Sequence, residues 1–138
     1  MILRSVEDTL AWGKALAAKL KPGDALAFVG TLGAGKTHAV KGVVAGLGAD
    51  ADVSSPTFTL VHEYEGGTLP IFHFDFYRLD SSGEVIGIGW DDYLDAGGVV
   101  VVEWADRFPD LFPPHTQWYQ FTIQEDGARK VEPMPMPQ

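Results

Sequence analysis

Apolar and small residues recur at helical spacing near the start of the chain, over residues 6–20. Ser5 precedes this pattern and Asp8 follows three residues later, an arrangement that favours capping of a helix N-terminus. A second helical pattern covers residues 36–47, and Gly48 after it is typical of a helix C-terminus. The pattern thus predicts two main helices. Shorter helical segments are predicted around residue 84 and over residues 91–96.

Runs of alternating or continuous apolar residues predict the strands. They cover residues 25–29, 58–64, 71–76, 99–102, 115–123 and 129–132. A Gly66-Gly67 hairpin joins the second and third of these strands, which must therefore be antiparallel. Four consecutive valines at 99–102 are instead typical of a parallel strand covered on both faces. The expected fold is α/β, with a mixed sheet flanked by helices.

The length of 138 residues suits a single domain. We expect residues 1–132 to form this domain. Residues 133–138, PMPMPQ, are expected to be a loose tail, because proline cannot donate a hydrogen bond to a sheet.

The segment GTLGAGKT, residues 30–37, lies between a predicted strand and a predicted helix. It fits the pattern G-x-x-x-x-G-K-[ST] of phosphate-binding loops. Glycines let the backbone turn around an anion, so that N–H groups and the positive end of the following helix point at phosphates. Lys36 is expected to reach the β- and γ-phosphates of a nucleotide, and the Thr37 hydroxyl to hold magnesium. The motif predicts a P-loop nucleotide triphosphatase.

Hydrolysis also needs a carboxylate near the metal and a group that orients water. Glu103 ends the valine strand, and the carboxyl ends of parallel strands are where ligands gather, so it is the stronger candidate. Asp75, near the end of another strand, could approach the same ion; its alternative is a helix cap or an ion pair with Arg78. Arg78 and Arg107 could steady charge on the γ-phosphate, although surface arginines usually form ordinary ion pairs.

Aromatic and histidine residues give weaker indications. Trp104 could stack on a base or be buried at the strand end, and His38 follows the loop with its backbone N–H near the α-phosphate. His62 and His73 lack a partner histidine at metal-binding spacing and are interpreted as strand residues. The polar segment 54–57 is open to two interpretations, an ordinary loop or a switch that responds to the γ-phosphate.

Composition narrows the possible partners. With 19 acidic and 10 basic residues, a net charge of −9 and no basic cluster, the chain lacks the features of a protein that grips nucleic acid directly. The absence of cysteine excludes disulfides and thiol chemistry. No apolar run is long enough to span a bilayer and no leader pattern is present, so we expect a cytoplasmic protein without a membrane partner.

Several segments together resemble the TsaE (formerly YjeE) family, the small bacterial ATPases of the tRNA threonylcarbamoyladenosine pathway. The segments that carry the resemblance are GTLGAGKTHAVKG, SSPTFTLVHEY, FHFDFYRL, GIGWDDYL and VVVVEWADR, in that order. They cover roughly residues 5–107.

The resemblance implies a set of residue roles. Magnesium would be bound by Thr37 and Glu103, with Asp75 in the same network of metal and water. The segment 55–57 would be a nucleotide-sensitive switch. The residues implied to contact ATP are Ser5, Gly33, Ala34, Gly35, Lys36, Thr37, His38, Thr57 and Trp104.

The resemblance further implies weak ATP hydrolysis that drives or resets a complex of TsaB and TsaD, which would hold the tRNA. This sequence departs from the family at Thr31, where an acid is common, and at His38, where threonine is common. These changes put an acidic contact and a hydroxyl near the α-phosphate in question. A small-molecule kinase and a nucleotide-dependent binding switch with negligible turnover are the alternative functions.

Overall fold

The computed structural model describes residues 1–31, 33–54 and 60–137, and within them seven strands form one mixed sheet. The strands are β1 (Ile2–Leu3), β2 (Ala25–Gly30), β3 (Val61–Tyr64), β4 (Ile71–Asp75), β5 (Val99–Glu103), β6 (Gln117–Ile123) and β7 (Arg129–Met134). The helices are α1 (Val6–Ala17), α2 (Lys36–Gly46), α3 (Ser82–Gly87) and α4 (Trp90–Leu94), with short 3-10 turns η1 (Ala105–Arg107) and η2 (Pro109–Leu111).

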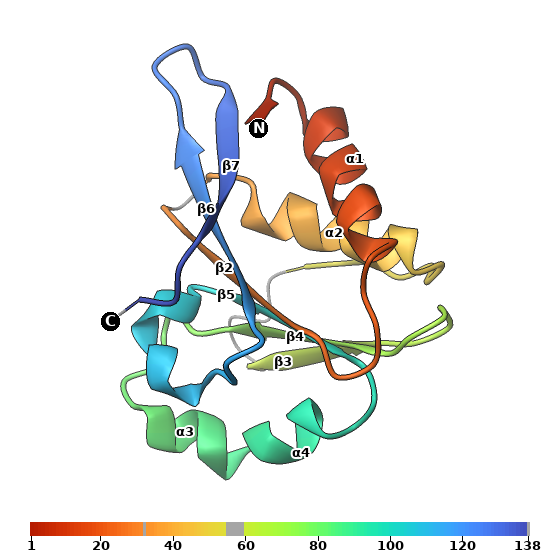
Figure 1. Cartoon of the computed structure of the whole chain (residues 1–138), viewed down its shortest axis with the longest axis vertical. Helices are drawn as coiled ribbons and strands as arrows, with labels where there is room; N and C mark the ends of the chain where they lie inside the picture. The colour runs from red at the N-terminus through yellow and green to blue at the C-terminus, as the bar shows by residue number, and fades with distance from the viewer. Residues whose placement is uncertain (32, 55–59, 138) are drawn as a thin grey trace.

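The strand order is β1-β7-β6-β2-β5-β4-β3. The four consecutive strands β6, β2, β5 and β4 run parallel, whereas β3 pairs antiparallel with β4 and β7 pairs antiparallel with β6 and β1. The predicted mixed α/β sheet is therefore confirmed. Since β2 lies at the centre, it delivers its carboxyl end and the following loop to the middle of one sheet edge (Figure 1).

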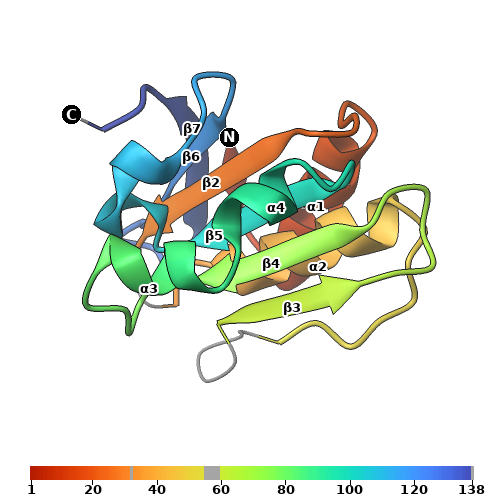
Figure 2. The same ribbon diagram turned by 90° about the horizontal axis from the view of Figure 1, so that it is seen from below.

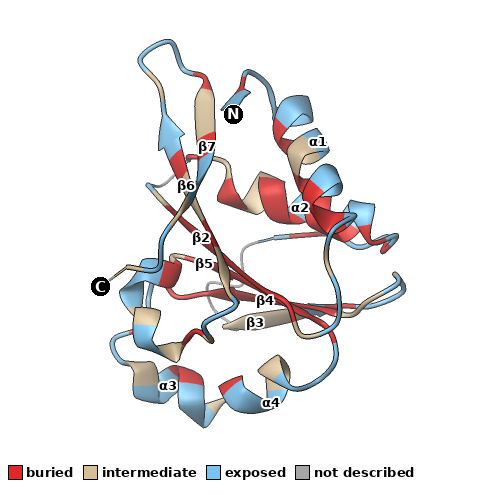
Figure 3. Cartoon of the chain, viewed as in Figure 1, coloured by how far each residue is buried: buried red, intermediate tan, exposed pale blue. Residues whose placement is uncertain are grey.

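Each face of the sheet is covered by a different pair of helices. The helices α1 and α2 pack on one face, and α3 and α4 lie on the other (Figure 2). Side chains alternate between the two faces along each strand, so every residue of β4 and β5 is buried (Figure 3). Of the described helices, none combines the length and the apolar character that a membrane span requires.

The contact between α1 and α2 depends on a close backbone approach at Gly13. A Cβ atom at this position would lie 2.5 Å from the carbonyl oxygen of Ala39 and 2.9 Å from the Cα of Gly42. Only glycine fits there without displacing one helix from the other. The α1 helix thereby fixes α2, and with it the residues at the start of α2.

The two ends of the described chain depart from the predicted pattern. The short strand β1, which was not predicted, pairs with β7. The predicted tail is shorter than expected, because Pro133 and Met134 belong to β7 and pair with Tyr119 and Trp118. The Val131 N–H points away from β6, to the Met1 carbonyl oxygen. By alternation the proline nitrogen also faces away from β6, so the missing N–H costs no bond to that strand.

Candidate functional site

The loop between β2 and α2 forms the centre of the site. Gly33 and Gly35 have φ values of 79° and 101°, in the region that favours glycine. Gly35 is the N-cap of α2 and provides no side-chain capping bond. By contrast, the Ser5 hydroxyl accepts a bond of 3.1 Å from the Asp8 N–H at the start of α1, as the sequence predicted. The uncapped start of α2 therefore has backbone donors suited to an anion.

A cleft of about 680 Å³ opens beside this loop. Most of the residues that the sequence singled out line this one cleft: Ser5, Gly33, Ala34, Gly35, Lys36, Thr37, His38, Asp75, Glu103 and Trp104. Arg78 also lines it. Thr57 and the proposed switch segment 55–57 lie outside the described residues. The fold thus brings together side chains from β4, β5 and both main helices.

Lys36 lies against its own loop. Its Nζ donates to the carbonyl oxygens of Gly30 at 2.6 Å and of Thr31 at 2.9 Å, and the residue is only 4% exposed. Burial lowers the pKa of Lys36 below its usual value of 10.5, while the nearby carboxylates, first of all Glu103, act in the opposite direction. A further negatively charged group bound in the cleft would stabilise the ammonium form of Lys36.

Trp104 follows β5 with a left-handed backbone conformation, at a φ of 58°. Its ring lies 4.3 Å from the Lys36 ammonium and packs on Tyr77, with the ring centroids 4.7 Å apart. A cation over an indole face is an attractive arrangement. The Trp104 side chain therefore lies beside Lys36 in the cleft.

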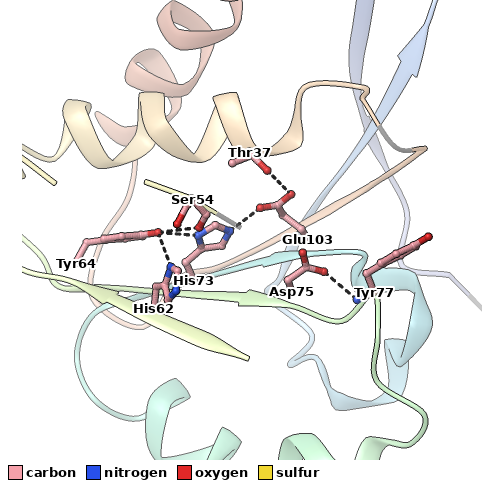
Figure 4. A network of polar contacts seen from close by, with 8 residues as sticks. All are labelled: Thr37, Ser54, His62, Tyr64, His73, Asp75, Tyr77 and Glu103. Atoms are coloured by element: carbon pink, nitrogen blue, oxygen red, sulfur yellow. Dashed lines mark hydrogen bonds and ion pairs between the residues drawn. The ribbon is translucent and has the colours of Figure 1, made fainter. Parts of the chain in front are cut away.

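Thr37, at the start of α2, and Glu103, at the end of β5, form a pair of oxygen-bearing side chains in the cleft. The Thr37 hydroxyl donates to Glu103 Oε1 at 2.8 Å (Figure 4). Asp75 stands beside Glu103 in the parallel register of β4 and β5, and its Oδ1 accepts a bond of 2.9 Å from the Tyr77 N–H. A hydroxyl and two carboxylates are hard oxygen donors, which is the chemistry that magnesium prefers when it retains several waters. The donor set fits this ion.

A buried histidine extends the pair into the sheet. His73 is a strand residue, as predicted, but its Nε2 lies 2.6 Å from Glu103 Oε2 and its Nδ1 lies 3.1 Å from the Tyr64 hydroxyl. The hydroxyl also donates to the Ser54 carbonyl oxygen, at 3.3 Å. Sequence reasoning missed this role. The available signal was the spacing of His73 and Asp75, since residues two apart on a strand share a face.

Arg107 lies outside the cleft, whereas Arg129, which the sequence did not single out, lies in it. Arg107 donates to the Leu79 carbonyl oxygen and lies over the Phe108 ring, and it is not among the residues that line the cleft. Arg129, which sequence reasoning did not consider, lines the cleft, and its Nε donates to the Gly33 carbonyl oxygen at 2.9 Å. Nothing in the local sequence marks Arg129, because only the antiparallel return of β7 brings it to the loop.

The fold and the cleft define an α/β protein whose central strand carries a glycine-rich loop into an uncapped helix, opposite two carboxylates on neighbouring strands. The family model of the threonylcarbamoyl adenosine biosynthesis protein TsaE matches residues 3–131. The chain therefore belongs to the TsaE family, which confirms the resemblance seen in the sequence.

Individual relatives agree with this assignment. The chain is 46% identical over 126 residues to the tRNA threonylcarbamoyladenosine biosynthesis protein TsaE of Bacillus subtilis (strain 168), covering 91% of this chain and 77% of the relative. It is 37% identical over 130 residues to the protein of the same name from Treponema pallidum (strain Nichols), covering 94% and 96%. The crystal structure of Bacillus subtilis YdiB superposes with a TM-score of 0.84 at 34% identity, covering 99% of this chain and 84% of that one. The family belongs to threonylcarbamoyladenosine biosynthesis.

Proposed function

We propose that this chain binds ATP with magnesium in the cleft and hydrolyses it. The observation that carries the proposal is the 2.8 Å bond between Thr37 and Glu103 beside the uncapped start of α2. This arrangement combines a site for phosphate oxygens with a site for their counter-ion.

The backbone of residues 33–38 would hold the phosphates. Lys36 would leave the carbonyl oxygens of Gly30 and Thr31, which it now binds, and contact the β- and γ-phosphates. Trp104 and the walls of the cleft would keep that ammonium partly shielded from water, which strengthens its attraction to phosphate. The neutralisation of the phosphoryl oxygens by Lys36 is the main contribution of this part of the chain.

Thr37 and Glu103 would bind the magnesium, which when bound neutralises charge on the β- and γ-phosphate oxygens. Asp75 would orient the attacking water, because it lies next to Glu103 on the neighbouring strand and lines the same cleft. The two carboxylates thus have different proposed roles. His38 would contribute its backbone N–H near the α-phosphate, and Ser5, which lines the same cleft, would contact the adenine end of the nucleotide.

We further propose that hydrolysis drives or resets a complex of TsaB and TsaD in the modification of tRNA. The net charge of −9 and the absence of a basic cluster in the sequence favour a chain that does not hold the RNA itself. In this proposal the RNA is bound by the partner proteins, and this chain supplies the nucleotide-dependent step.

Single-turnover hydrolysis of ATP, with and without purified TsaB and TsaD, tests the proposal. We expect slow phosphate release by the chain alone and faster release with both partners. Tight binding without release in either case would instead indicate a nucleotide-dependent binding switch. Phosphate transfer to a metabolite well above the rate of hydrolysis would indicate a small-molecule kinase. A pull-down with TsaB and TsaD in ATP and in ADP shows whether assembly depends on the nucleotide.

A further inference from the structure

A continuous chain of polar contacts passes from the cleft into the sheet. It begins at the Thr37 hydroxyl and continues through Glu103, His73 and Tyr64 to the Ser54 carbonyl oxygen (Figure 4). His73 has no exposed surface, and Glu103 is 3% exposed. Polar side chains are rarely buried this deeply unless their hydrogen bonds are satisfied.

The contacts of Glu103 leave its carboxylate little freedom. Thr37 donates to Oε1 and His73 approaches Oε2, so the two oxygens are held from opposite sides. The imidazole is itself fixed, because the Tyr64 hydroxyl lies 3.1 Å from the other ring nitrogen. A carboxylate held at both oxygens keeps one orientation, and groups that hold a metal ligand in this way commonly affect metal affinity.

We propose that His73 is a positioning residue for the metal site. Its Nε2 holds Glu103 Oε2, so that Oε1 stays beside the Thr37 hydroxyl and faces the cleft. His73 contacts neither the nucleotide nor the metal in this assignment and acts only through Glu103. The inference rests on the proposed function, since it assumes that Glu103 binds magnesium.

Two variants that differ by one methylene group separate positioning from packing. The amide of His73→Gln reaches about as far as Nε2 and can still donate to Glu103. The amide of His73→Asn reaches only about as far as Nδ1, and so it keeps a polar group near Tyr64 but loses Glu103. Both variants bury an amide in place of an imidazole, so the general cost of the substitution is matched.

The measurement is the gain in ADP affinity that magnesium provides, obtained by calorimetry in excess magnesium and in a metal chelator. We expect His73→Asn to reduce this gain about 10- to 100-fold, the usual effect of removing a group that orients a metal ligand. His73→Gln should keep the gain within a few-fold of the parent. Affinity for ADP without metal should change little in either variant, because the loop that binds the phosphates is intact.

The outcomes distinguish this inference from the proposed function. If the parent binds no ADP under either condition, the proposed function is wrong. If the parent shows the magnesium gain and both variants keep it, or both lose it equally, His73 does not position Glu103. Should His73→Asn fail to fold, judged by its thermal transition without nucleotide, Tyr64→Phe replaces it. Tyr64→Phe removes only the hydroxyl that fixes the ring, and an unchanged magnesium gain in that variant would also overturn the inference.

Discussion

The two faces of strands β4 and β5 contain adjacent residues of the same chain and yet have opposite chemistry. On the side of α3 and α4, β4 contributes Phe72 and Phe74 to a cluster of buried hydrophobic side chains. On the side of α1 and α2 the same strand begins with the apolar Ile71, but it continues with His73 and Asp75 towards the cleft. One face is apolar along its whole length, whereas the other changes from apolar to charged.

The difference indicates how the sheet supports buried charge. Aromatic rings pack closely on the apolar face, with the Phe74 centroid 5.1 Å from Trp90 and the Phe76 centroid 6.0 Å from Phe112. Such contacts stabilise the folded state by burial and by edge-to-face attraction. The buried ionisable groups on the opposite face carry a desolvation cost. The apolar face therefore offsets that cost and keeps β4 and β5 in the register that places Asp75 beside Glu103.

The largest expected effect is on the apolar face. Phe74→Ala should lower the free energy of unfolding by about 3–5 kcal/mol, because it leaves a cavity at a fully buried aromatic position. Denaturant unfolding measures this change. The matched control is Ile86→Ala at a position that is 55% exposed, where we expect a change within about 0.5 kcal/mol. Similar losses for both variants would contradict the role given to the apolar face.

A substitution on the charged face, which contains His73, Asp75 and Glu103, should change the activity more than the stability of the fold. Glu103→Ala removes the proposed metal ligand, and we expect magnesium-dependent ATP hydrolysis to fall on the order of 100-fold, since bound metal contributes several kcal/mol of charge stabilisation. Nucleotide binding in a chelator should change far less. Steady-state phosphate release over a range of magnesium concentrations provides the measurement. Retention of full hydrolysis would assign the metal to another group.

The buried position of Lys36 predicts a pH dependence. Because burial lowers the Lys36 pKa below 10.5, the folded protein loses this proton at a lower pH than an exposed lysine does. Phosphate attraction requires the protonated form, so ATP affinity should decrease as the pH rises and should begin to do so below 10.5. Fluorescence titration of a labelled nucleotide at several pH values tests this. Lys36→Arg is the control, since its guanidinium stays charged and its affinity should vary less with pH.

The smallest effect is expected at the rim of the cleft. Arg129→Ala removes the bond to the Gly33 carbonyl oxygen, which is worth about 1 kcal/mol, so nucleotide affinity should weaken about fivefold or less. Lys130→Ala is the control on the next residue, whose exposed ion pair with Glu132 lies away from the loop. A larger loss in Lys130→Ala than in Arg129→Ala would exclude a role of Arg129 in holding the loop.

Local sequence signals predicted most of the fold, because helix caps, hairpin glycines and apolar periodicity act over a few residues. Gly48, for example, has the positive φ of a helix C-terminus, and the valine strand β5 is buried along its length between β2 and β4. The exceptions depend on partners distant in sequence. Pro133 is accommodated in β7 because its nitrogen faces away from β6, which the local sequence does not reveal.

The candidate site likewise contains residues that the local sequence predicted and residues whose contacts depend on distant parts of the chain. The glycine-rich loop, Lys36 and Thr37 are adjacent in sequence, and Glu103 was predicted from its place at the end of a strand; all of them line the cleft. His73 and Arg129 were missed because their contacts join residues 30 and 96 positions apart. Contacts of that kind are determined by strand order, which periodicity does not specify.

Nucleotide binding in the cleft is proposed to depend on the backbone of residues 33–38 and on Lys36. Calorimetric titration of magnesium and ATP into the parent chain and into Lys36→Ala tests it most directly. We expect saturable binding to one site in the parent and little or no binding in the variant. Equal heats of binding for the two chains, or no heat for the parent with or without TsaB and TsaD, would contradict it.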